Sequence, residues 1–365
     1  MRIALVVPGG VDPSGEYRVI PALLALIERL GARHDLEVFA LMQLPEPAKW
    51  RLGGVRVCNV GTVQMRRRAI AALRGAHQRQ PFDLVHSMWS GSSGLVAVAA
   101  AGLMRRPSLV HVTGGEVVSL PAVGYGGGRT WRGRLREAVV LRLATCVSAT
   151  SRPLVAELAR LGIRAARVPL GVDLRRWPPR APPARQPQGE ARLLHVGTLN
   201  AVKDQATMLH ALARLRAAGQ AFHLDLVGDD ILGGRMQGLA RELGLAERVT
   251  FHGFLTQAQL RPLFERAALL VMSSRHEAGP FVALEAAIAG VPTVGTAVGH
   301  LSEWAPQAAC TVSPGDAAGL ATAVAQLLGD EPRRLAIAHA AQARALAEDA
   351  DFTVRAFEAL YAQVV

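Results

Sequence analysis

Short apolar segments recur along the chain, and most are followed by a polar or glycine-containing turn and then by a helical pattern. In the first half these segments occupy residues 3–8, 36–41, 55–60, 83–87 and 108–112. In the second half they occupy residues 192–197, 222–228, 248–253 and 267–272. Strands that alternate with helices indicate parallel sheets with helices on both faces. The sequence therefore predicts an α/β protein built from doubly wound parallel sheets.

A proline-rich stretch separates the two series of segments. Residues 175–190 read RRWPPRAPPARQPQGE, with five prolines and no apolar periodicity, which is typical of a stiff, extended linker. The chain of 365 residues is long enough for two domains with separate cores. We expect an N-terminal domain over residues 1–174, a second domain over 191–350, and a terminal helix at 351–365 that crosses back to the first domain.

Charge is distributed unevenly between the two halves. Residues 1–185 carry 27 basic and 11 acidic side chains, a balance of +16, whereas residues 186–365 carry 14 and 18, a balance of −4. A basic half attracts anionic partners such as lipid head groups, phosphorylated molecules or nucleic acid. A general preference for arginine explains the excess equally well, because only Lys49 and Lys203 are lysines. No RNA-binding motif is evident, so we expect no nucleic-acid partner.

The cysteines and the hydropathy pattern bear on the compartment. Cys58, Cys146 and Cys310 are far apart and odd in number, which indicates neither a disulfide framework nor a metal cluster. No stretch of about 18 uninterrupted apolar residues occurs, so we expect no signal peptide or membrane span. These features favour a cytoplasmic protein, and peripheral contact with the inner face of a membrane is left open.

Residues 273–303 carry the strongest chemical signal. They follow the apolar segment 267–272, and polar side chains at the carboxyl end of a buried parallel strand lie where ligands bind in open sheets. Glu277 and Glu285 stand eight residues apart, one in the loop and one in the second turn of the next helix, so both carboxylates can face one polar ligand. Pro280 suits the first helical position, where the amide groups carry partial positive charge.

This pattern resembles the donor site of the retaining GT-B glycosyltransferases of family 4. Glu-x7-Glu is followed by A-x-x-G-x-P-x-V and by a loop with Gly295 and Gly299. The resemblance implies a GT-B fold, in which two Rossmann-like doubly wound domains face a central cleft. Two positions depart from the family: Gly279 stands where an aromatic residue is common, and His300 stands where a second glycine is common. Taken singly, each glutamate is equally compatible with a solvated helix position.

Further segments extend the resemblance over most of the chain. FDLVHSMWS and VPLGVD are similar to family segments in the first half, and TLNAVKD resembles the family's G-[RK]-L-x-x-x-K segment, which holds the donor diphosphate. Lys203 occupies the lysine position, but Thr198 stands where the family has an arginine. The resemblance implies that Glu277 and Lys203 are catalytic. It also implies a set of donor-binding residues: Gly197, Thr198, Arg275, Gly279, Pro280, Phe281, Glu285 and Gly299.

A mechanism follows from this assignment. No Asp-x-Asp metal motif sits at a strand end, so we expect Lys203, Arg275, the helix amides and the loop at Gly299 to stabilise the leaving diphosphate without a metal. Glu277 would bind sugar hydroxyls and Glu285 the ribose hydroxyls. The resemblance alone implies retention of anomeric configuration. We expect no bound cofactor and a nucleoside diphosphate sugar, most readily a UDP- or GDP-sugar, as co-substrate.

The acceptor is expected to bind loops of the first domain. Many family members place a histidine where Thr113 stands, and His111 lies two residues earlier on the same face of its strand, so it can reach the cleft edge. A histidine buried within the strand is the alternative interpretation. The acceptor itself is left open as a sugar, a lipid-linked molecule or another small molecule. The predicted acceptor-side residues are Gly10, Gly15, Arg18, His111, Thr113, Gly115 and Glu116.

Residues 130–143, TWRGRLREAVVLRL, predict an amphipathic helix. Trp131 and Leu135 share one face, and Arg132 and Arg136 share the neighbouring face. Such a helix is typical of a peripheral contact with an anionic membrane. It is equally typical of a helix that packs its tryptophan and leucine against its own sheet.

Two other functions remain open at this point. One is a GT-B sugar-nucleotide epimerase, which would need additional acid and base groups in the cleft. The other is a polyanion-binding protein that uses the basic N-terminal domain. The loop LVHVTGGE and the segment VPLGVD favour the transferase over the epimerase. The sequence does not identify the nucleotide base, the sugar, the acceptor or the oligomeric state.

Overall fold

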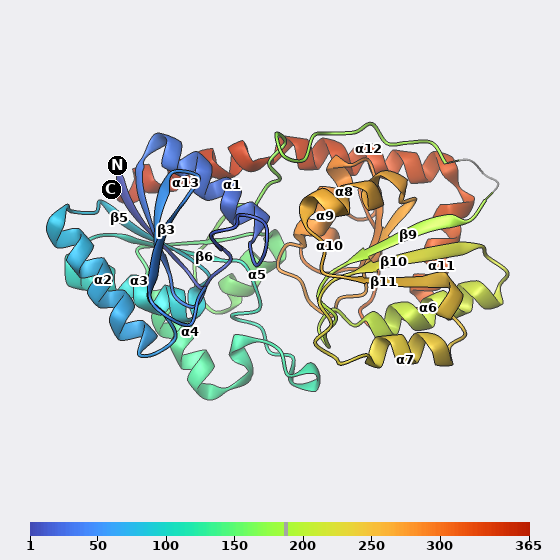
Figure 1. Cartoon of the computed structure of the whole chain (residues 1–365), viewed down its shortest axis with the longest axis horizontal. Helices are drawn as coiled ribbons and strands as arrows, with labels where there is room; N and C mark the ends of the chain where they lie inside the picture. The colour runs from blue at the N-terminus through green and yellow to red at the C-terminus, as the bar shows by residue number, and fades with distance from the viewer. Residues whose placement is uncertain (186–188) are drawn as a thin grey trace. The chain divides into compact units, whose positions relative to one another are not determined.

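The computed structural model describes residues 1–185 and 189–365, which divide into two compact units. The first unit comprises Met1–Asp173 together with Glu348–Val365, and the second comprises Leu174–Ala347. Each unit is built on one largely parallel sheet with helices on its faces (Figure 1). The predicted fold class is therefore confirmed.

The sheet of the first unit has eight strands in the order β3-β4-β2-β1-β5-β6-β7-β8. All neighbouring strands are parallel except β3 and β4, which form an antiparallel hairpin at one edge that the sequence analysis did not predict. The strands are β1 (Arg2–Val7), β2 (Asp35–Ala40), β3 (Ala48–Leu52), β4 (Val55–Asn59), β5 (Leu84–Met88), β6 (Ser108–Val112), β7 (Cys146–Ala149) and β8 (Ala166–Arg167).

Alternate side chains of β1 enter two separate hydrophobic cores, because successive residues of a strand point to opposite faces. Ile3 and Leu5 pack with α1 and α13 on one face of the sheet. Ala4 and Val6 pack with α2 and α3 on the other. The helices of this unit are α1 (Pro21–Arg33), α2 (Met65–Arg79), α3 (Leu95–Met104), α4 (Trp131–Leu143), α5 (Arg152–Arg160) and α13 (Ala350–Val364).

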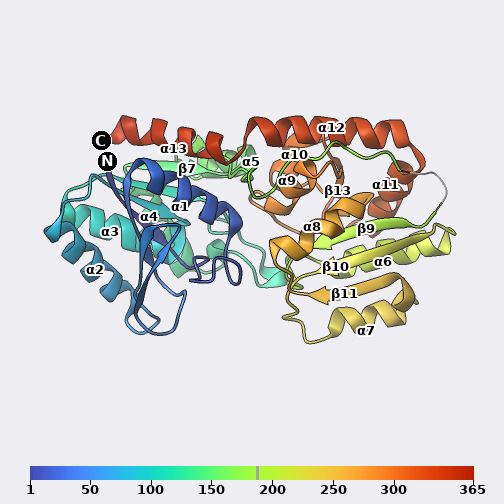
Figure 2. The same ribbon diagram turned by 45° about the horizontal axis from the view of Figure 1, so that its top comes forward.

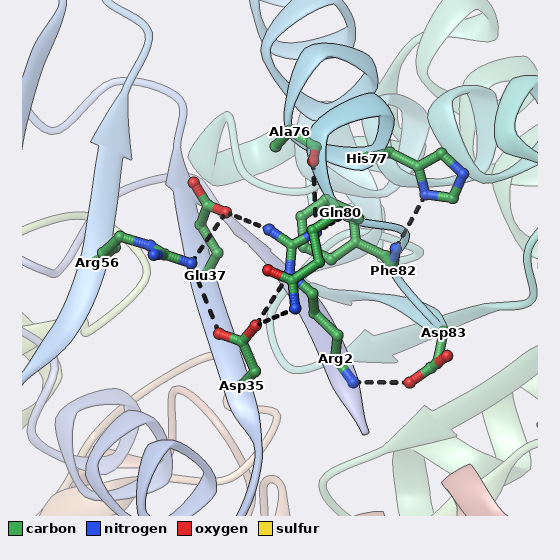
Figure 3. A network of polar contacts seen from close by, with 9 residues as sticks. All are labelled: Arg2, Asp35, Glu37, Arg56, Ala76, His77, Gln80, Phe82 and Asp83. Atoms are coloured by element: carbon green, nitrogen blue, oxygen red, sulfur yellow. Dashed lines mark hydrogen bonds and ion pairs between the residues drawn. The ribbon is translucent and has the colours of Figure 1, made fainter.

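A buried arginine ties the start of β1 to its neighbours (Figure 3). The Arg2 guanidinium donates to Asp35 Oδ2 and to Glu37 Oε2 on β2, each at 3.1 Å. It also donates to the backbone oxygens of Ala76 and Gln80, near the end of α2. Two carboxylates and two carbonyl groups therefore satisfy this cation, as a charge removed from water requires.

The last helix, α13, lies beside α1 (Figure 2). Phe357 and Tyr361 enter the same core as β1. Arg29 of α1 forms ion pairs with Asp351 at 2.6 Å and with Asp173 at 2.8 Å. Apolar contacts and one arginine thus hold the end of the chain on the first unit.

The sheet of the second unit has six parallel strands in the order β11-β10-β9-β12-β13-β14. Counted along the chain this is the order 3-2-1-4-5-6 of Rossmann-type sheets. The strands are β9 (Ala191–Val196), β10 (Phe222–Val227), β11 (Val249–Gly253), β12 (Leu269–Val271), β13 (Thr293–Thr296) and β14 (Cys310–Val312). The helices are α6 (Gln205–Ala217), α7 (Arg235–Glu242), α8 (Gln257–Arg266), α9 (Phe281–Ile288), α10 (His300–Trp304), α11 (Ala317–Gly329) and α12 (Glu331–Ala347).

The described part of the proline-rich stretch packs along the second unit. Residues 174–185 contain no helix or strand. Trp177 is buried, donates from Nε1 to the carbonyl oxygen of Glu285 at 2.9 Å, and meets the ring of Phe264 edge-on. Residues 186–188 of the predicted linker lie outside the described residues. The segment before them begins with a turn at residues 174–176 and is held against a core by Trp177.

Candidate donor and acceptor sites

The carboxyl ends of β9 and β12 lie side by side where the strand order of the second sheet reverses. Ligands bind at such a switch point in open α/β sheets. The loop after β9 carries Gly197, Thr198 and Lys203, and the loop after β12 carries Arg275 and Glu277. The structure thus brings these five predicted donor-site residues to one edge of the second unit.

Lys203 and Glu277 form an ion pair in which Lys203 Nζ lies 2.5 Å from Glu277 Oε1. Ser274 Oγ donates to the same carboxylate oxygen at 2.7 Å. The backbone around Lys203 is fixed from two sides. Its amide donates to Asn200 Oδ1 at 2.9 Å, and its carbonyl oxygen accepts from Ser273 Oγ at 2.9 Å. Side chains of the loops after β9 and β12 therefore hold both members of the ion pair in place.

Arg275 supplies a second cation beside this pair. Its Nε lies 2.9 Å from Asp204 Oδ2, and its amide donates to the carbonyl oxygen of Val202 at 2.7 Å. The side chain is exposed even though it is paired. The carbonyl oxygen of Thr198 accepts from Gln205 Nε2 at 3.1 Å, so this residue contributes its backbone to the loop.

Glu285 lies in the second turn of α9 and is only 5% exposed. Its Oε1 accepts a hydrogen bond from Gln257 Nε2 at 2.9 Å. Burial raises the pKa of the Glu285 carboxyl to about 7, although the hydrogen bond from Gln257 acts in the opposite direction. At neutral pH a large share of these carboxyl groups is protonated and can donate as well as accept a hydrogen bond.

Helix α9 begins one residue later than predicted. Pro280 occupies the N-cap position with φ −65°, and Phe281 is the first helical residue. The fixed φ of proline is compatible with either position, and the residue carries no amide hydrogen in either. Gly299 has a positive φ of +51° and lies close to the loop after β12. A Cβ atom at this position would lie 2.9 Å from the carbonyl oxygen of Glu277. Gly279 lies in the same loop after β12.

The predicted acceptor-side loop after β1 is fixed by a buried glutamine. Gly10, Gly15 and Arg18 all lie in this loop. Arg18 Nη2 donates to the carbonyl oxygen of Gln43 at 3.0 Å, and Gln43 Oε1 accepts from the amide of Val11 at 3.0 Å. Gln43 therefore links the loop after β1 to the segment after β2.

The loop after β6 closes on its own carboxylate. Glu116 is buried and accepts hydrogen bonds from the amides of Gly114 at 2.6 Å and Thr113 at 3.3 Å. Burial raises the pKa of Glu116, and hydrogen bonds from backbone amides, including that of Thr113, oppose the shift. A Cβ atom on Gly115 would lie 2.4 Å from the ring of Tyr125, so a larger residue there would require that ring to move. The loop is thus held in one conformation.

His111 lies inside the first sheet. Its Nδ1 is 2.9 Å from Ser148 Oγ, and its ring meets that of Phe357 edge-on at a centroid distance of 5.0 Å. Full burial lowers the pKa of His111 to about 3, so the imidazole is neutral at physiological pH. In this structure the side chain is part of the hydrophobic core.

The sequence analysis missed several residues that support these sites. An asparagine three residues before Lys203 is a signal for an Asx turn, and Asn200 forms one. Ser274 lies in the loop that follows the buried strand β12, which is also a signal. The sequence gives no signal for Gln257. This residue begins α8 and contacts Glu285 only because helices α8 and α9 pack together.

Two family descriptions match the chain. "Glycosyl transferase 4-like domain" matches residues 19–171, and "Glycosyl transferases group 1" matches residues 190–330. The chain belongs to the GT-B glycosyltransferases of the family 4 type. The resemblance inferred from the paired glutamates is therefore confirmed.

Comparisons of the glycosyltransferase with individual proteins support the same family. The glycogen synthase of Mycobacterium tuberculosis is 36% identical over 185 residues, which cover 50% of this chain and 44% of that protein. The match thus spans less than half of the relative's length. Among solved structures, sucrose-phosphate synthase from Thermosynechococcus elongatus has a TM-score of 0.81 at 21% identity and covers 100% of this chain and 99% of its own. HepE of Anabaena, solved with UDP and glucose, has a TM-score of 0.79 at 18% identity, and both chains are fully covered.

Two features are absent from residues 1–185 and 189–365 of the glycosyltransferase. Within these ranges no helix is both long enough and apolar enough to span a bilayer. The same ranges contain no group of three or more histidine, cysteine, aspartate or glutamate residues placed to hold a metal ion.

Proposed function

We propose that this glycosyltransferase moves a sugar from a nucleoside diphosphate sugar to an acceptor, with retention of anomeric configuration and without a metal ion. The observation that carries the proposal is the Lys203–Glu277 ion pair at the switch point of the second sheet. A cation and a carboxylate at the ligand-binding edge supply one group for the diphosphate and one for the sugar hydroxyls.

The donor diphosphate would bind to positive groups on this edge. Its charge would draw Lys203 away from Glu277, because two phosphate groups attract an ammonium group more strongly than one carboxylate does. Arg275 would supply the contact that Thr198 cannot make. The first-turn amides of α9, which no side chain caps, would add to the positive field. Such fixed donors can stabilise the charge on a leaving diphosphate, and metal-independent transfer is proposed on this ground.

Glu277 would orient the donor sugar. When Lys203 turns to the diphosphate, the hydrogen bond from Ser274 at 2.7 Å still holds the Glu277 carboxylate in place. That carboxylate would then accept from sugar hydroxyl groups and fix the anomeric carbon relative to the acceptor. Ser274 acts here as a positioning residue, and Glu277 need not be a nucleophile.

Glu285 would bind the ribose. The hydrogen bond from Gln257 fixes the orientation of its carboxyl group, and a partly protonated carboxyl can both accept from and donate to a pair of hydroxyl groups. The HepE structure with UDP and glucose supports a UDP-sugar as the first donor to examine, with a GDP-sugar as the second.

The acceptor is proposed to bind loops of the first unit. The loop with Gly10, Gly15 and Arg18 and the loop at residues 113–116 both follow strands of this sheet and are held by buried polar side chains. A sugar, a lipid-linked molecule or another small molecule would fit this assignment.

Turnover and product stereochemistry test the proposal together. The full chain is incubated with UDP- and GDP-sugars and a panel of acceptors, once with EDTA and once with added Mg²⁺, and the anomeric configuration of the product is read by NMR. We expect one donor to be consumed at the same rate under both conditions, and the product to keep the donor's configuration. An inverted product would contradict retention, and activity only with Mg²⁺ would contradict metal independence.

A further inference from the structure

Helix α4 directs four of its large apolar side chains outward. Four residues at four-residue intervals form one stripe along this helix. Their exposed fractions are 63%, 56%, 38% and 66%, in the order Trp131, Leu135, Val139 and Leu143. Single exposed apolar residues are common on protein surfaces, but a continuous apolar stripe marks an interaction surface.

The opposite side of α4 is anchored to the first unit by polar contacts. Glu137 is buried, accepts from Ser90 Oγ at 2.5 Å and accepts from Arg136 Nε at 2.9 Å. Val140 is fully buried on the same side, and Thr130 caps the start of the helix. Because the carboxylate faces inward, rotation of the helix would expose Val140 and break the Ser90 contact. The outward direction of the apolar stripe is therefore fixed.

Apart from the buried Glu137, the charged side chains of residues 124–143 are all positive. The only acidic residue between positions 124 and 143 is Glu137, whose carboxylate is on the inner side. At 100° per residue, Arg134 lies on one side of the stripe and Arg136 on the other. The arginines of this segment are Arg129, Arg132, Arg134, Arg136 and Arg142.

We propose that α4 is a docking surface for an anionic lipid bilayer. Apolar side chains that include a tryptophan can enter the boundary between head groups and acyl chains, while arginines contact the lipid phosphates. A second copy of the chain fits the stripe less well, because the approach would bring arginines against arginines. This inference goes beyond the proposed sugar transfer and does not depend on it.

Co-sedimentation of the full chain with vesicles tests the docking surface. We expect binding at low salt to vesicles of phosphatidylcholine with phosphatidylglycerol, release as NaCl is raised, and no binding to phosphatidylcholine alone. Arg132→Gln with Arg142→Gln should weaken binding by about fivefold for each arginine. Trp131→Ser with Leu135→Ser should weaken binding as well, because the variant loses the apolar contact with the acyl boundary.

Matched controls carry the same changes on the second unit. Arg214→Gln with Arg241→Gln removes two exposed arginines of α6 and α7, and Ile231→Ser removes an apolar side chain that is 68% exposed. Both controls should bind anionic vesicles as the unaltered chain does. Far-ultraviolet circular dichroism of every variant separates loss of binding from loss of folding.

Tryptophan fluorescence provides a second readout. Trp131 is the exposed tryptophan, whereas Trp50, Trp89, Trp177 and Trp304 are buried or half-buried. Anionic vesicles should therefore shift the emission to shorter wavelength, and Trp131→Phe should abolish the shift while retaining binding.

Three results would overturn the inference. The first is no binding to anionic vesicles at low ionic strength. The second is binding that is unchanged in Trp131→Ser with Leu135→Ser. The third is a dimer in solution that Leu135→Ser with Leu143→Ser converts to a monomer, because the stripe would then pair two copies of the chain.

Discussion

Glu285 is a residue whose protonation near neutral pH depends on the fold. Burial raises the pKa of its carboxyl from 4.5 to about 7. Because the folded-state pKa lies above that of the unfolded chain, the folded protein binds more protons between these two values. The stabilising contribution of Glu285 is therefore complete below pH 4.5 and is lost as the pH rises through about 7.

Glu285→Gln should remove this pH dependence in the protein without ligand. The amide keeps an oxygen that can accept from Gln257 but does not ionise. The free energy of unfolding of the variant, relative to the unaltered chain, should rise between about pH 5 and about pH 8 by at most roughly 3 kcal/mol. Urea unfolding of both proteins at these two pH values measures this change in the free energy of unfolding.

The control for this comparison is Glu265→Gln. Glu265 is exposed on α8, where it pairs with Arg261 at 3.1 Å. Its replacement should change the free energy of unfolding equally at both pH values. The same behaviour in Glu285→Gln would show that the buried carboxyl does not titrate in this range.

Among the secondary-structure elements, strand β1 is held in place by the ion pairs and hydrogen bonds of Arg2. Arg2→Met would leave the Glu37 carboxylate, whose side chain is 12% exposed, without its closest cation. The first unit should lose roughly 3 kcal/mol of stability, because a largely buried carboxylate then keeps only its longer contact with the exposed Arg56. Arg56→Met is the matched control: Arg56 contacts the same carboxylates at 3.6 and 3.9 Å and is 50% exposed, so its loss should cost less than about 1 kcal/mol.

Hydrogen exchange of the β1 and β2 amides measures this difference within the first unit. Arg2→Met should accelerate exchange of these amides strongly, and Arg56→Met should leave it close to that of the unaltered chain. Equal exchange in the two variants would contradict the role of Arg2 as the anchor of β1.

Most strands could be predicted because they are buried on both faces and therefore read as continuous apolar runs. The predicted segment 108–112 coincides with β6. Two strands were missed, β3 and β14, and each lies at an edge of its sheet. In β3 alternate side chains such as Lys49 and Arg51 are exposed. Gly53 and Gly54, both with positive φ, form the tight turn into β4 and were the available signal for this hairpin.

The candidate donor site was predictable where residues lie in a loop that follows a buried strand, as Glu277 does in the loop after β12. It was not predictable where the environment comes from distant elements. The burial of His111 depends on Phe357 of α13, and the pKa of Glu285 depends on how α9 is covered. The outward stripe of α4 also required the structure, because the sequence pattern fitted either orientation of Trp131.

At the scale of the whole molecule, the two sets of candidate residues separate cleanly. All predicted donor-site residues lie in Leu174–Ala347, and all predicted acceptor-side residues lie in Met1–Asp173. The second unit, Leu174–Ala347, carries 17 basic and 14 acidic side chains, a balance of only +3, so local cations such as Lys203 must supply most of the attraction for the diphosphate. The donor-site residues can therefore be tested with a nucleotide sugar, and the acceptor-side residues with an acceptor.

The central claim is that Lys203 and Glu277 bind different parts of one donor. Calorimetric titration of the full chain compares a nucleoside diphosphate with the corresponding nucleotide sugar. Lys203→Ala should weaken both ligands by about tenfold or more, because a charge-assisted hydrogen bond is lost. Glu277→Ala should bind the nucleoside diphosphate at least as tightly as the unaltered chain, since Lys203 loses its competing carboxylate. The same variant should lose the additional affinity that the sugar provides.

Glu265→Ala is the control for this titration and should bind both ligands normally. The account predicts that the two variants differ in this way, with Lys203→Ala impaired for the diphosphate and Glu277→Ala impaired only for the sugar. If no UDP- or GDP-sugar binds the unaltered chain, or if both variants bind the nucleotide sugar as tightly as the unaltered chain, the assignment of the donor site is wrong.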